Sequence, residues 1–555
     1  MSSAKHPLPA PVMFPGDEPF WEATAQGKLL VKHCPQCQRS HFYPRKHCPL
    51  CGHPQTQWRE VSGRGTVYSY TVMGRAARPT APAIIELEEG IRLSTVVVDA
   101  DIHTLRIGDP VTLRFLPAEG GKNALAFTTP EADHARHYSL QAIEALGQVQ
   151  GDGAQAFQEA AIIGSGHMGT GIALAFLAAG MRVQLIDSAA QSLAAGRERI
   201  EVALRKDLER GRLDTSAHAA RLALLQTSIA VQDAARADVI VEAIFEDMAL
   251  KQQLFAVLDT IAAPHALLAT NTSTLNVGEI AAATRRPGSV VGLHFFNPAN
   301  VMQLIEVVRA PQTSEHTLRQ AKALAARLGK VAVTVGICDG FVGNRLMIRR
   351  EREAARLLLE GALPQQIDRV LREFGLPMGT FELQDMAGGI ALTYHARKRA
   401  GQSDWLIEQL FERGRIGQRA GKGYYRYDSG KRTPIVDPEV TGLIEQASQV
   451  AQIERRTLSD AEICDRLILP MINEGAKLVE EGIVERASDI DLVWQFGYGW
   501  PAWKGGPMYH ADVIGVSTVV HRLQSLRDTH GERFEPAKLL VRLAGAQQTL
   551  ITPAS

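Results

Sequence analysis

A glycine-rich segment near the middle of the chain has the residue types and spacing of a phosphate-binding turn. It lies between an apolar run, 160–163, and a helix-like run, and it consists of Gly164, Ser165, Gly166, His167, Met168 and Gly169. The first glycine allows a tight turn, the second lets the backbone approach a pyrophosphate, and the third lets helix and strand pack closely. The following helix would offer free N–H groups and a partial positive charge to the phosphates.

An acidic residue ends the next strand-like run. Asp187 follows 181–186 and can accept hydrogen bonds from the ribose hydroxyls of a dinucleotide. A carboxylate there repels a 2′-phosphate, so the pattern favours NAD over NADP. The competing interpretation is a glycine turn in a structural α/β unit. Strand, turn, helix and acid all lie at the offsets of a βαβ unit, which favours the nucleotide site.

Polar side chains follow the ends of the later strand-like runs. The carboxyl ends of parallel strands meet at the cofactor crevice of an open sheet. We therefore expect four residues that are far apart in the sequence to converge there: Glu246, Ser273, His294 and Asn297.

His294 has the chemistry of a general base for alcohol oxidation. Transfer of a hydride from a secondary alcohol to NAD⁺ needs a group that accepts the hydroxyl proton, and histidine does so near neutral pH. The chain returns through Pro298 into a strand that carries Glu306, which could hold the imidazole in one tautomer. A single histidine among 17 would ordinarily be a surface or core residue. Its position at a strand end beside an NAD fold favours the catalytic interpretation.

Four of the six cysteines form a cluster of two CxxC turns: Cys34, Cys37, Cys48 and Cys51. Four thiolates can surround one tetrahedral ion, with Zn²⁺ the first expectation and iron the second. Such a site is closed and structural. Redox-active CxxC pairs and a site that has lost its metal are the alternatives. Cys338 and Cys464 are expected to be inert core thiols.

The composition excludes several classes of protein. The 555 residues suggest three or four domains, and 45% apolar residues suffice for several cores. Lys plus Arg number 60, as do Asp plus Glu, so no net field favours nucleic acid or an acidic membrane. No apolar run has transmembrane length, and the N-terminus lacks a signal-peptide core. We expect a cytoplasmic protein.

The region after the cysteines predicts a small antiparallel barrel of the OB type. Its short strand-like runs are 65–72, 83–87, 93–98 and 111–115. Basic residues interleaved with Phe42 and Tyr43 could suit nucleic acid, whereas a solvated zinc ribbon explains them equally well. The glycine-rich stretch after this module lacks periodicity and predicts a linker, 134–157.

The segment 15–130 resembles the DUF35 family, through Phe20-Trp21, Gly27-Lys28-Leu29-Leu30, the two CxxC turns and the run 65–70. Members have a rubredoxin-like zinc ribbon followed by an OB fold. The resemblance implies an accessory module that handles acyl-CoA or docks a thiolase-like or hydratase partner. It argues against binding to nucleic acid.

The region that follows resembles the NAD domain of L-3-hydroxyacyl-CoA dehydrogenases. The matching motifs are the glycine loop, 242–248, 271–275, 294–298 and 306–308. The resemblance implies that His294 is the catalytic base and Glu306 its partner. It places Glu246, Lys251, Ser273 and Asn297 around the nicotinamide half of NAD, with Ser273 also touching substrate. Arg210 replaces a lysine that contacts CoA in the family, so the CoA contacts depart from the family pattern.

The helical C-terminal part is predicted to be a duplication of the family's second domain. The run 339–346 opens the first copy, and 464–467 opens a similar helix about 120 residues later. The resemblance implies that Asn344 binds the substrate oxygen and that Arg419 lies near NAD. The second copy has Asp465 in place of Asn344 and is expected to be structural.

The expected fold is multidomain: a zinc ribbon with an OB-type barrel, an α/β Rossmann domain, and two all-α dehydrogenase C-terminal-type domains. The predicted boundaries are 1–133, 158–336, 337–430 and 458–555, with linkers at 134–157 and 431–457. The resemblances imply an NAD-dependent (S)-3-hydroxyacyl-CoA dehydrogenase, as a monomer or a homodimer. The rival hypothesis is a non-catalytic CoA-binding scaffold.

Overall fold

The computed structural model describes residues 8, 10–73, 81–147 and 157–551. The chain divides into two compact units by its internal contacts. Unit 1 consists of residues 1–138, 363–447 and 501–505, and unit 2 of residues 139–362, 448–500 and 506–555. Most of the glycine-rich stretch that predicted the first linker, 148–156, lies outside the described residues.

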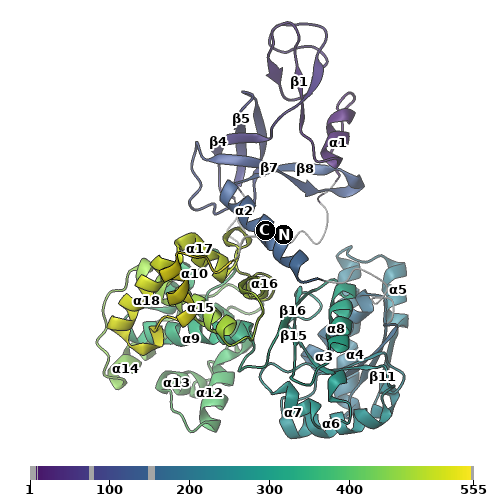
Figure 1. The fold of residues 1–555 in the computed structure, drawn as a ribbon, viewed down its shortest axis with the longest axis vertical. Coiled ribbons are helices and arrows are strands. Elements are labelled where there is room, and N and C mark those ends of the chain that lie inside the picture. Colours follow the sequence, from purple (N-terminus) through teal and green to yellow (C-terminus); the bar gives the residue numbers. More distant parts are fainter. Residues whose placement is uncertain (1–7, 9, 74–80, 148–156, 552–555) are drawn as a thin grey trace. The chain divides into compact units, whose positions relative to one another are not determined.

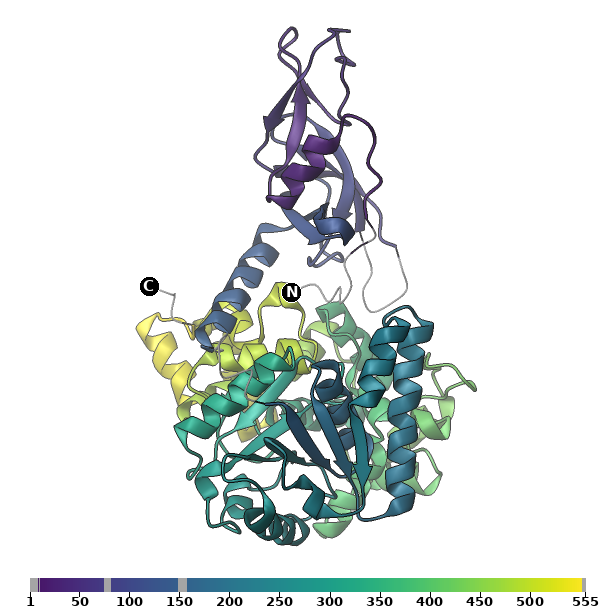
Figure 2. The same cartoon turned by 90° about the vertical axis from the view of Figure 1, so that its right-hand side faces the viewer.

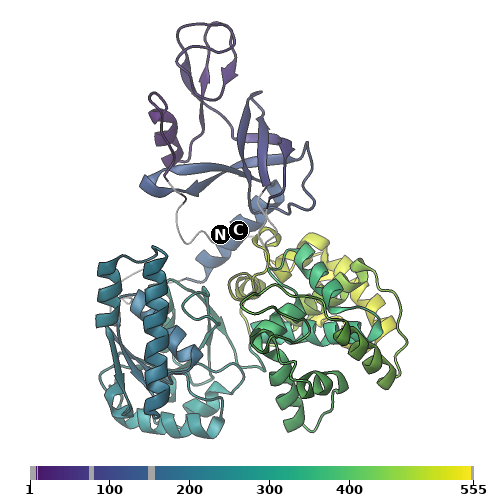
Figure 3. The ribbon, with the colours of Figure 1, turned by 180° about the vertical axis from the view of Figure 1, so that it is seen from behind.

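Unit 1 begins with the cysteine ribbon and a closed barrel (Figure 3). Helix α1 (Glu18–Ala25) precedes the ribbon strands β1 (Leu30–His33), β2 (Ser40–His41) and β3 (Gln57–Glu60). The barrel has the order β4-β5-β6-β8-β7. Its strands are β4 (Arg64–Tyr70), β5 (Ala81–Leu87), β6 (Arg92–Val97), β7 (Pro110–Pro117) and β8 (Asn123–Thr128). Alternate apolar side chains such as Val67, Ile85 and Leu93 fill its interior, which confirms the predicted barrel.

The remaining helices of unit 1 come from the first copy of the helical region. They are α10 (Pro364–Phe374), α11 (Thr380–Ala387), α12 (Gly389–Arg399) and α13 (Trp405–Glu412). Both predicted linkers contain a helix. Helix α2 (Pro130–Ala145) overlaps the first linker, and α14 (Pro438–Val450) lies in the second. Each helix begins with a proline, and Gly442 is the one glycine within the two, so both stretches contain few residues that break a helix.

Unit 2 contains the dinucleotide-type sheet, in the order β11-β10-β9-β12-β13-β14-β15-β16 (Figure 2). The strands are β9 (Glu159–Ile163), β10 (Arg182–Ile186), β11 (Leu225–Ser228), β12 (Val239–Glu242), β13 (Leu267–Thr270), β14 (Val290–Phe295), β15 (Leu304–Val308) and β16 (Val331–Val335). All neighbouring pairs are parallel except β14 and β15. The sheet is therefore a mainly parallel, Rossmann-type sheet with one antiparallel pair, which confirms the predicted α/β domain.

The helices beside this sheet are α3 (His167–Ala178), α4 (Ala190–Glu209), α5 (Thr215–Ala223), α6 (Met248–Ile261), α7 (Val277–Ala281) and α8 (Glu315–Arg327). Apolar residues of the strands form a cluster on each face of the sheet. Strand β9 lies between β10 and β12, so later strands are added on opposite sides of β9, and the strand order reverses there. A crevice for ligands is expected at the carboxyl end of such a strand.

The helices of the second copy are α15 (Asp460–Glu480), α16 (Ala487–Gly497), α17 (Pro507–Ile514), α18 (Val516–His530) and α19 (Lys538–Ala546). Equivalent capping contacts support the duplication. Asp368 accepts hydrogen bonds from the N–H groups of Phe381 and Glu382, each at 3.0 Å. In the second copy, Asp491 accepts them from Met508 at 2.7 Å and Tyr509 at 2.9 Å.

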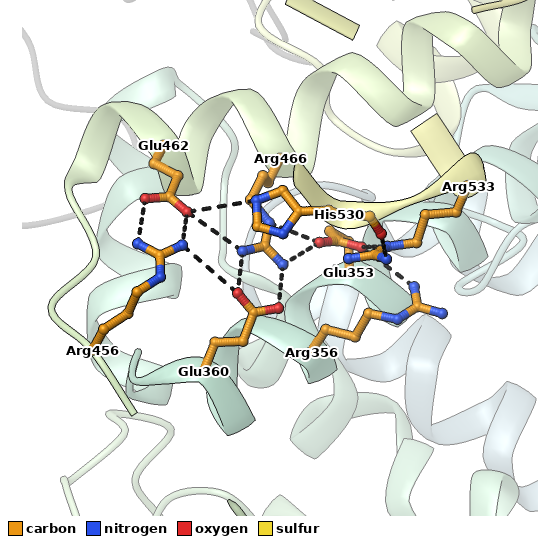
Figure 4. A network of polar contacts seen from close by, with 8 residues as sticks. All are labelled: Glu353, Arg356, Glu360, Arg456, Glu462, Arg466, His530 and Arg533. Atoms are coloured by element: carbon orange, nitrogen blue, oxygen red, sulfur yellow. Dashed lines mark hydrogen bonds and ion pairs between the residues drawn. The ribbon is translucent and has the colours of Figure 1, made fainter. Parts of the chain in front are cut away.

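Helix α9 (Gly343–Glu360) belongs to the first copy by sequence but lies in unit 2, where it packs against α15 (Figure 1). A buried ion network joins the two helices (Figure 4). Arg466 of α15 has a fully buried side chain that bonds Glu353 at 2.8 Å and Glu360 at 2.5 Å. Because these acids need the cation, α9 is held to the second copy.

Candidate active site

The glycine loop follows β9 and leads into α3. Gly164 has a φ of 104°, and a Cβ there would lie 2.4 Å from the carbonyl oxygen of Ala243. A Cβ on Gly169 would lie 1.8 Å from the carbonyl oxygen of Gly164. Both positions therefore require glycine, for the turn and for close packing. A Cβ on Gly166 would meet no atom within 4 Å, so open space adjoins the backbone where a pyrophosphate is expected.

The N-terminus of α3 has no side-chain cap. His167 is exposed there, and Met168 is half-buried. The uncapped N–H groups of a helix are a ready site for an anion. Open space beside Gly166 and a free helix end together fit the phosphates of a dinucleotide.

Asp187 follows β10 and contacts the glycine loop directly. Its carboxylate accepts hydrogen bonds from the N–H of Ser165 at 2.9 Å and from the Ser165 hydroxyl at 2.7 Å, and it also accepts one from the N–H of Ala189. Burial opposes the charged form, yet these hydrogen bonds outweigh it and lower the pKa of Asp187. Ser165 is fully buried, so its side chain fixes the acid rather than facing a ligand.

Lys251 lies beneath the surface of the site. Its side chain is fully buried, and its ammonium lies 2.6 Å from Glu242 and 3.4 Å from Glu246. The expected contact of Lys251 with the cofactor is thus not a direct one in this structure. Glu242, at the end of β12, also accepts a hydrogen bond from the Thr270 hydroxyl at 2.7 Å. In the sequence Glu242 stands out only as part of the motif 242–248. Its position at the end of a buried strand is the signal that indicates pairing with a buried cation such as Lys251.

Glu246 organises the loop after β13. One of its oxygens accepts hydrogen bonds from the Thr272 hydroxyl at 2.5 Å and from the N–H of Ser273 at 2.9 Å. Burial opposes ionisation, but Thr272 and the charge of Lys251 lower the pKa of Glu246. Asn271 accepts a hydrogen bond from the N–H of Phe295 at 2.9 Å, which joins this loop to the end of β14. Two of the predicted residues, Glu246 and Ser273, are thereby in contact.

His294 and Glu306 form a direct cross-strand pair between β14 and β15. Nδ1 of His294 lies 2.6 Å from Oε2 of Glu306. A carboxylate only accepts hydrogen bonds, so Nδ1 carries the proton and Nε2 keeps its lone pair. The rings of Phe296 and Phe341 pack against the imidazole, at centroid distances of 4.6 and 5.5 Å. The contact predicted between the base and its carboxylate is present in the structure.

The other oxygen of Glu306 accepts hydrogen bonds from the backbone at the start of helix α9. Oε1 accepts hydrogen bonds from the N–H of Val342 at 3.1 Å and of Gly343 at 3.0 Å. Glu306 is completely buried, so these bonds and the imidazole satisfy it. Asn344 is the next residue of α9 and therefore lies in the turn that binds Glu306.

Three residues that were expected to contact a ligand have exposed side chains. Asn297 is exposed in the loop after β14. Arg210 is exposed at the C-cap of α4. Arg419 is exposed in a short 3₁₀ helix of unit 1, Gln418–Ala420, so its contact with the cofactor remains a prediction.

The four cysteines of the ribbon come together as the spacing predicted. Their Sγ atoms all lie within 4.8 Å of one another, with 3.6 Å between Cys34 and Cys51 and 3.8 Å between Cys37 and Cys48. Four thiolates about 2.3 Å from one zinc ion would be separated by about 3.8 Å. The cluster therefore fits a structural zinc ion. Among the described residues, it is the one group of Cys, His and acidic side chains with this geometry.

Comparison with known families assigns most of the chain. The 3-hydroxyacyl-CoA dehydrogenase NAD binding domain matches residues 159–338, and the C-terminal domain of the same enzymes matches residues 340–427 and again 463–549. The chain belongs to the 3-hydroxyacyl-CoA dehydrogenase family. Its N-terminal part matches the ChsH2 rubredoxin-like zinc ribbon domain over 21–56 and the ChsH2 OB-fold domain over 58–116. Both predicted resemblances and the duplication are confirmed.

Similar members of the dehydrogenase family include multifunctional enzymes. The peroxisomal bifunctional enzyme of Danio rerio is 37% identical over 407 residues, which is 70% of this chain and 56% of that protein. The human peroxisomal bifunctional enzyme is 38% identical over 403 residues, 69% of this chain and 56% of that protein. The chain thus spans little more than half the length of these relatives.

Solved structures of the dehydrogenase family share this fold. The 3-hydroxybutyryl-CoA dehydrogenase of Escherichia coli K12 has a TM-score of 0.61 and 26% identity, over 70% of this chain and 98% of that one. The dehydrogenase part of multifunctional enzyme 1 from C. elegans has a TM-score of 0.55 and 30% identity, over 70% and 89%. In the described part of this chain, no helix is both long enough and apolar enough to cross a membrane.

Proposed function

We propose that this chain oxidises an (S)-3-hydroxyacyl-CoA to a 3-oxoacyl-CoA with NAD⁺ as the oxidant. The observation that carries the proposal is the 2.6 Å contact between His294 and Glu306 at the carboxyl edge of an NAD-type sheet. A buried carboxylate on Nδ1 leaves Nε2 as a base, and the family relationship supports the substrate class.

The chain's own residues would divide the work as follows. Nε2 of His294 accepts the proton of the substrate hydroxyl, and Glu306 stabilises the imidazolium that results. Bound NAD⁺ would take the hydride from the carbon that carries this hydroxyl group. The Asn344 amide and the Ser273 hydroxyl hold the reacting oxygen, while Arg210 contacts the CoA moiety.

The cofactor would lie along the glycine loop. Gly164, Gly166 and Gly169 shape the turn, and the first residues of α3, including His167 and Met168, present N–H groups to the phosphates. Asp187 would accept hydrogen bonds from the ribose hydroxyls, through carboxylate lone pairs that Ser165 does not use. The nicotinamide half would lie against Glu246, Ser273 and Asn297, with Lys251 acting through Glu246.

The N-terminal module would handle acyl-CoA or dock a thiolase-like or hydratase partner that uses the 3-oxoacyl-CoA. The ChsH2-type ribbon and barrel support this role. Exposed apolar side chains on the ribbon side of unit 1 are available for contact, namely Phe14, Tyr43 and Leu50. Deletion of residues 1–130 should abolish association with a thiolase in a pull-down from the native host, with NAD binding retained as the control for folding. Undiminished association would refute docking.

The dehydrogenase reaction is tested by following the formation of NADH through its absorbance. Short-, medium- and long-chain, aromatic and steroid-derived 3-hydroxyacyl-CoAs form the panel. Activity with one class, lost in His294→Gln while NADH still binds, would support the proposal. Binding of CoA esters without turnover of any member would instead make the chain a scaffold.

A further inference from the structure

Asn344 does not stand alone in the active site. Its side-chain oxygen Oδ1 accepts a hydrogen bond from the hydroxyl of Tyr498 at 2.6 Å. The two residues are 154 positions apart, because Tyr498 is the C-cap residue of α16 in the second copy. Helix α16 packs against β15, β16 and α9 within unit 2 (Figure 1).

In the structure the amide oxygen of Asn344, and not its nitrogen, faces the hydroxyl of Tyr498. Burial and the nearby charge of Glu306 raise the pKa of Tyr498 well above its usual value, so the hydroxyl keeps its proton. A phenol that donates must meet the oxygen of the amide, not its nitrogen. The NH₂ group of Asn344 is consequently turned away from Tyr498 and can serve as a donor to another group.

Packing holds the tyrosine ring in place from several sides. The ring stacks on Trp494 at a centroid distance of 4.5 Å and meets the edge of Phe296 at 5.4 Å. Phe296 itself packs on His294. A Cβ on Gly343 would lie 2.2 Å from the Tyr498 ring, so glycine is required where α9 begins. The same segment of α9 thus binds Glu306 with its backbone and Tyr498 with its side chain.

We infer that Tyr498 is a positioning residue, by which the second helical copy orients the Asn344 amide so that its NH₂ donates to the 3-oxygen of the substrate. This inference rests on the proposed function of Asn344. It assigns the second copy a role in the reaction site, whereas the sequence predicted a structural copy only. Without the hydroxyl, the amide could rotate and present its oxygen, which repels the substrate oxygen.

A Tyr498→Phe variant removes the hydroxyl and keeps the ring stacking. We expect kcat/KM for the best 3-hydroxyacyl-CoA to fall about tenfold, the loss expected for one aligned hydrogen bond. NADH affinity should not change. In an Asn344→Ala background, the same substitution should change kcat/KM by less than about twofold, because the amide it orients is gone. Tyr68→Phe in the barrel is the matched control and should keep full activity.

A tenfold loss in both backgrounds would overturn the inference, since Tyr498 would then act independently of Asn344. No loss in the first background would overturn it as well. Binding of a 3-oxoacyl-CoA panel is measured for the wild-type chain, for Tyr498→Phe, for Asn344→Ala and for the double variant. These measurements separate the role of Tyr498 from the proposed reaction. A wild-type chain that binds the panel without turnover would refute the proposed reaction, and the cycle in Kd would still decide the role of Tyr498. A chain that neither binds nor turns over any member would overturn both.

Discussion

Glu306 joins the imidazole of His294 to the first turn of α9. One oxygen lies 2.6 Å from Nδ1, and the other accepts the N–H groups of Val342 and Gly343. The carboxylate therefore sets the tautomer of the base and the position of the helix that carries Asn344 at the same time. A change at this one side chain should affect chemistry more than folding.

Glu306→Gln tests that relationship. The amide oxygen can still accept the helix N–H groups, but its NH₂ would face Nδ1 and force the proton onto Nε2. The base would then be in the wrong tautomer, and kcat should fall by about a thousandfold or more. Stopped-flow measurement of NADH formation gives the rate, and NADH fluorescence titration should show unchanged affinity. Glu315→Gln is the control, because Glu315 is exposed and pairs with the exposed Arg309; its kcat should not change.

Asp187→Ala tests the cofactor site. The substitution removes the proposed ribose acceptor and the hydrogen bonds to Ser165 that hold the glycine loop. We expect the Kd for NAD⁺ to rise about tenfold or more, while kcat at saturating NAD⁺ changes less. The loss of affinity should be smaller for NADP⁺ than for NAD⁺, because the substitution also removes the repulsion between the acid and the 2′-phosphate. Unchanged NAD⁺ affinity would mean that the ribose lies elsewhere.

The cysteine cluster predicts one zinc ion per chain. Replacement of Cys48 by serine removes one thiolate, so the metal content measured by plasma mass spectrometry should fall to near zero. NAD binding should persist, because the cysteines and the glycine loop lie in different compact units. Cys464→Ser, outside the cluster, should leave the zinc content unchanged. A wild-type chain with iron or no metal would contradict the assignment.

The buried guanidinium of Arg466 should be a major contributor to the stability of unit 2. Arg466→Met keeps similar volume but removes the fully buried cation from Glu353 and Glu360, which keep the more exposed Arg356, Arg456 and Arg533 nearby (Figure 4). We expect a loss of about 3–5 kcal/mol in the free energy of unfolding of the calorimetric transition that includes α9. Arg356→Met removes a half-exposed partner of Glu353 and should cost less than about 1 kcal/mol. Equal losses in both variants would contradict the role of burial.

The same network predicts destabilisation by acid. Burial opposes ionisation of Glu360, but hydrogen bonds from Arg466 outweigh it and lower its pKa, while Arg456 lowers the pKa of Glu462. Acids whose pKa is lower in the folded chain stabilise it above their unfolded pKa, near 4.5. This stability is lost as the pH falls through the folded pKa values. Urea titrations from neutral pH to below pH 4 should show the loss, with a smaller slope in Glu462→Gln.

Short-range features were predictable because their physics is local. The glycine turn, the following helix and Asp187 lie within one βαβ unit, where the chain itself sets the distances. The two CxxC turns likewise bring thiols together by spacing alone. Even the pair of His294 and Glu306 follows from a short return between adjacent strands, whose register places them opposite each other.

Local sequence patterns thus predicted the fold class, the nucleotide turn, the cysteine cluster and the contact between His294 and Glu306. The packing of α9 against the second copy and the contact of Tyr498 with Asn344 arise only in the folded chain. These contacts join elements separated by up to 154 residues. No local spacing sets such distances, because they depend on how separately formed helices and strands exclude water from one shared core.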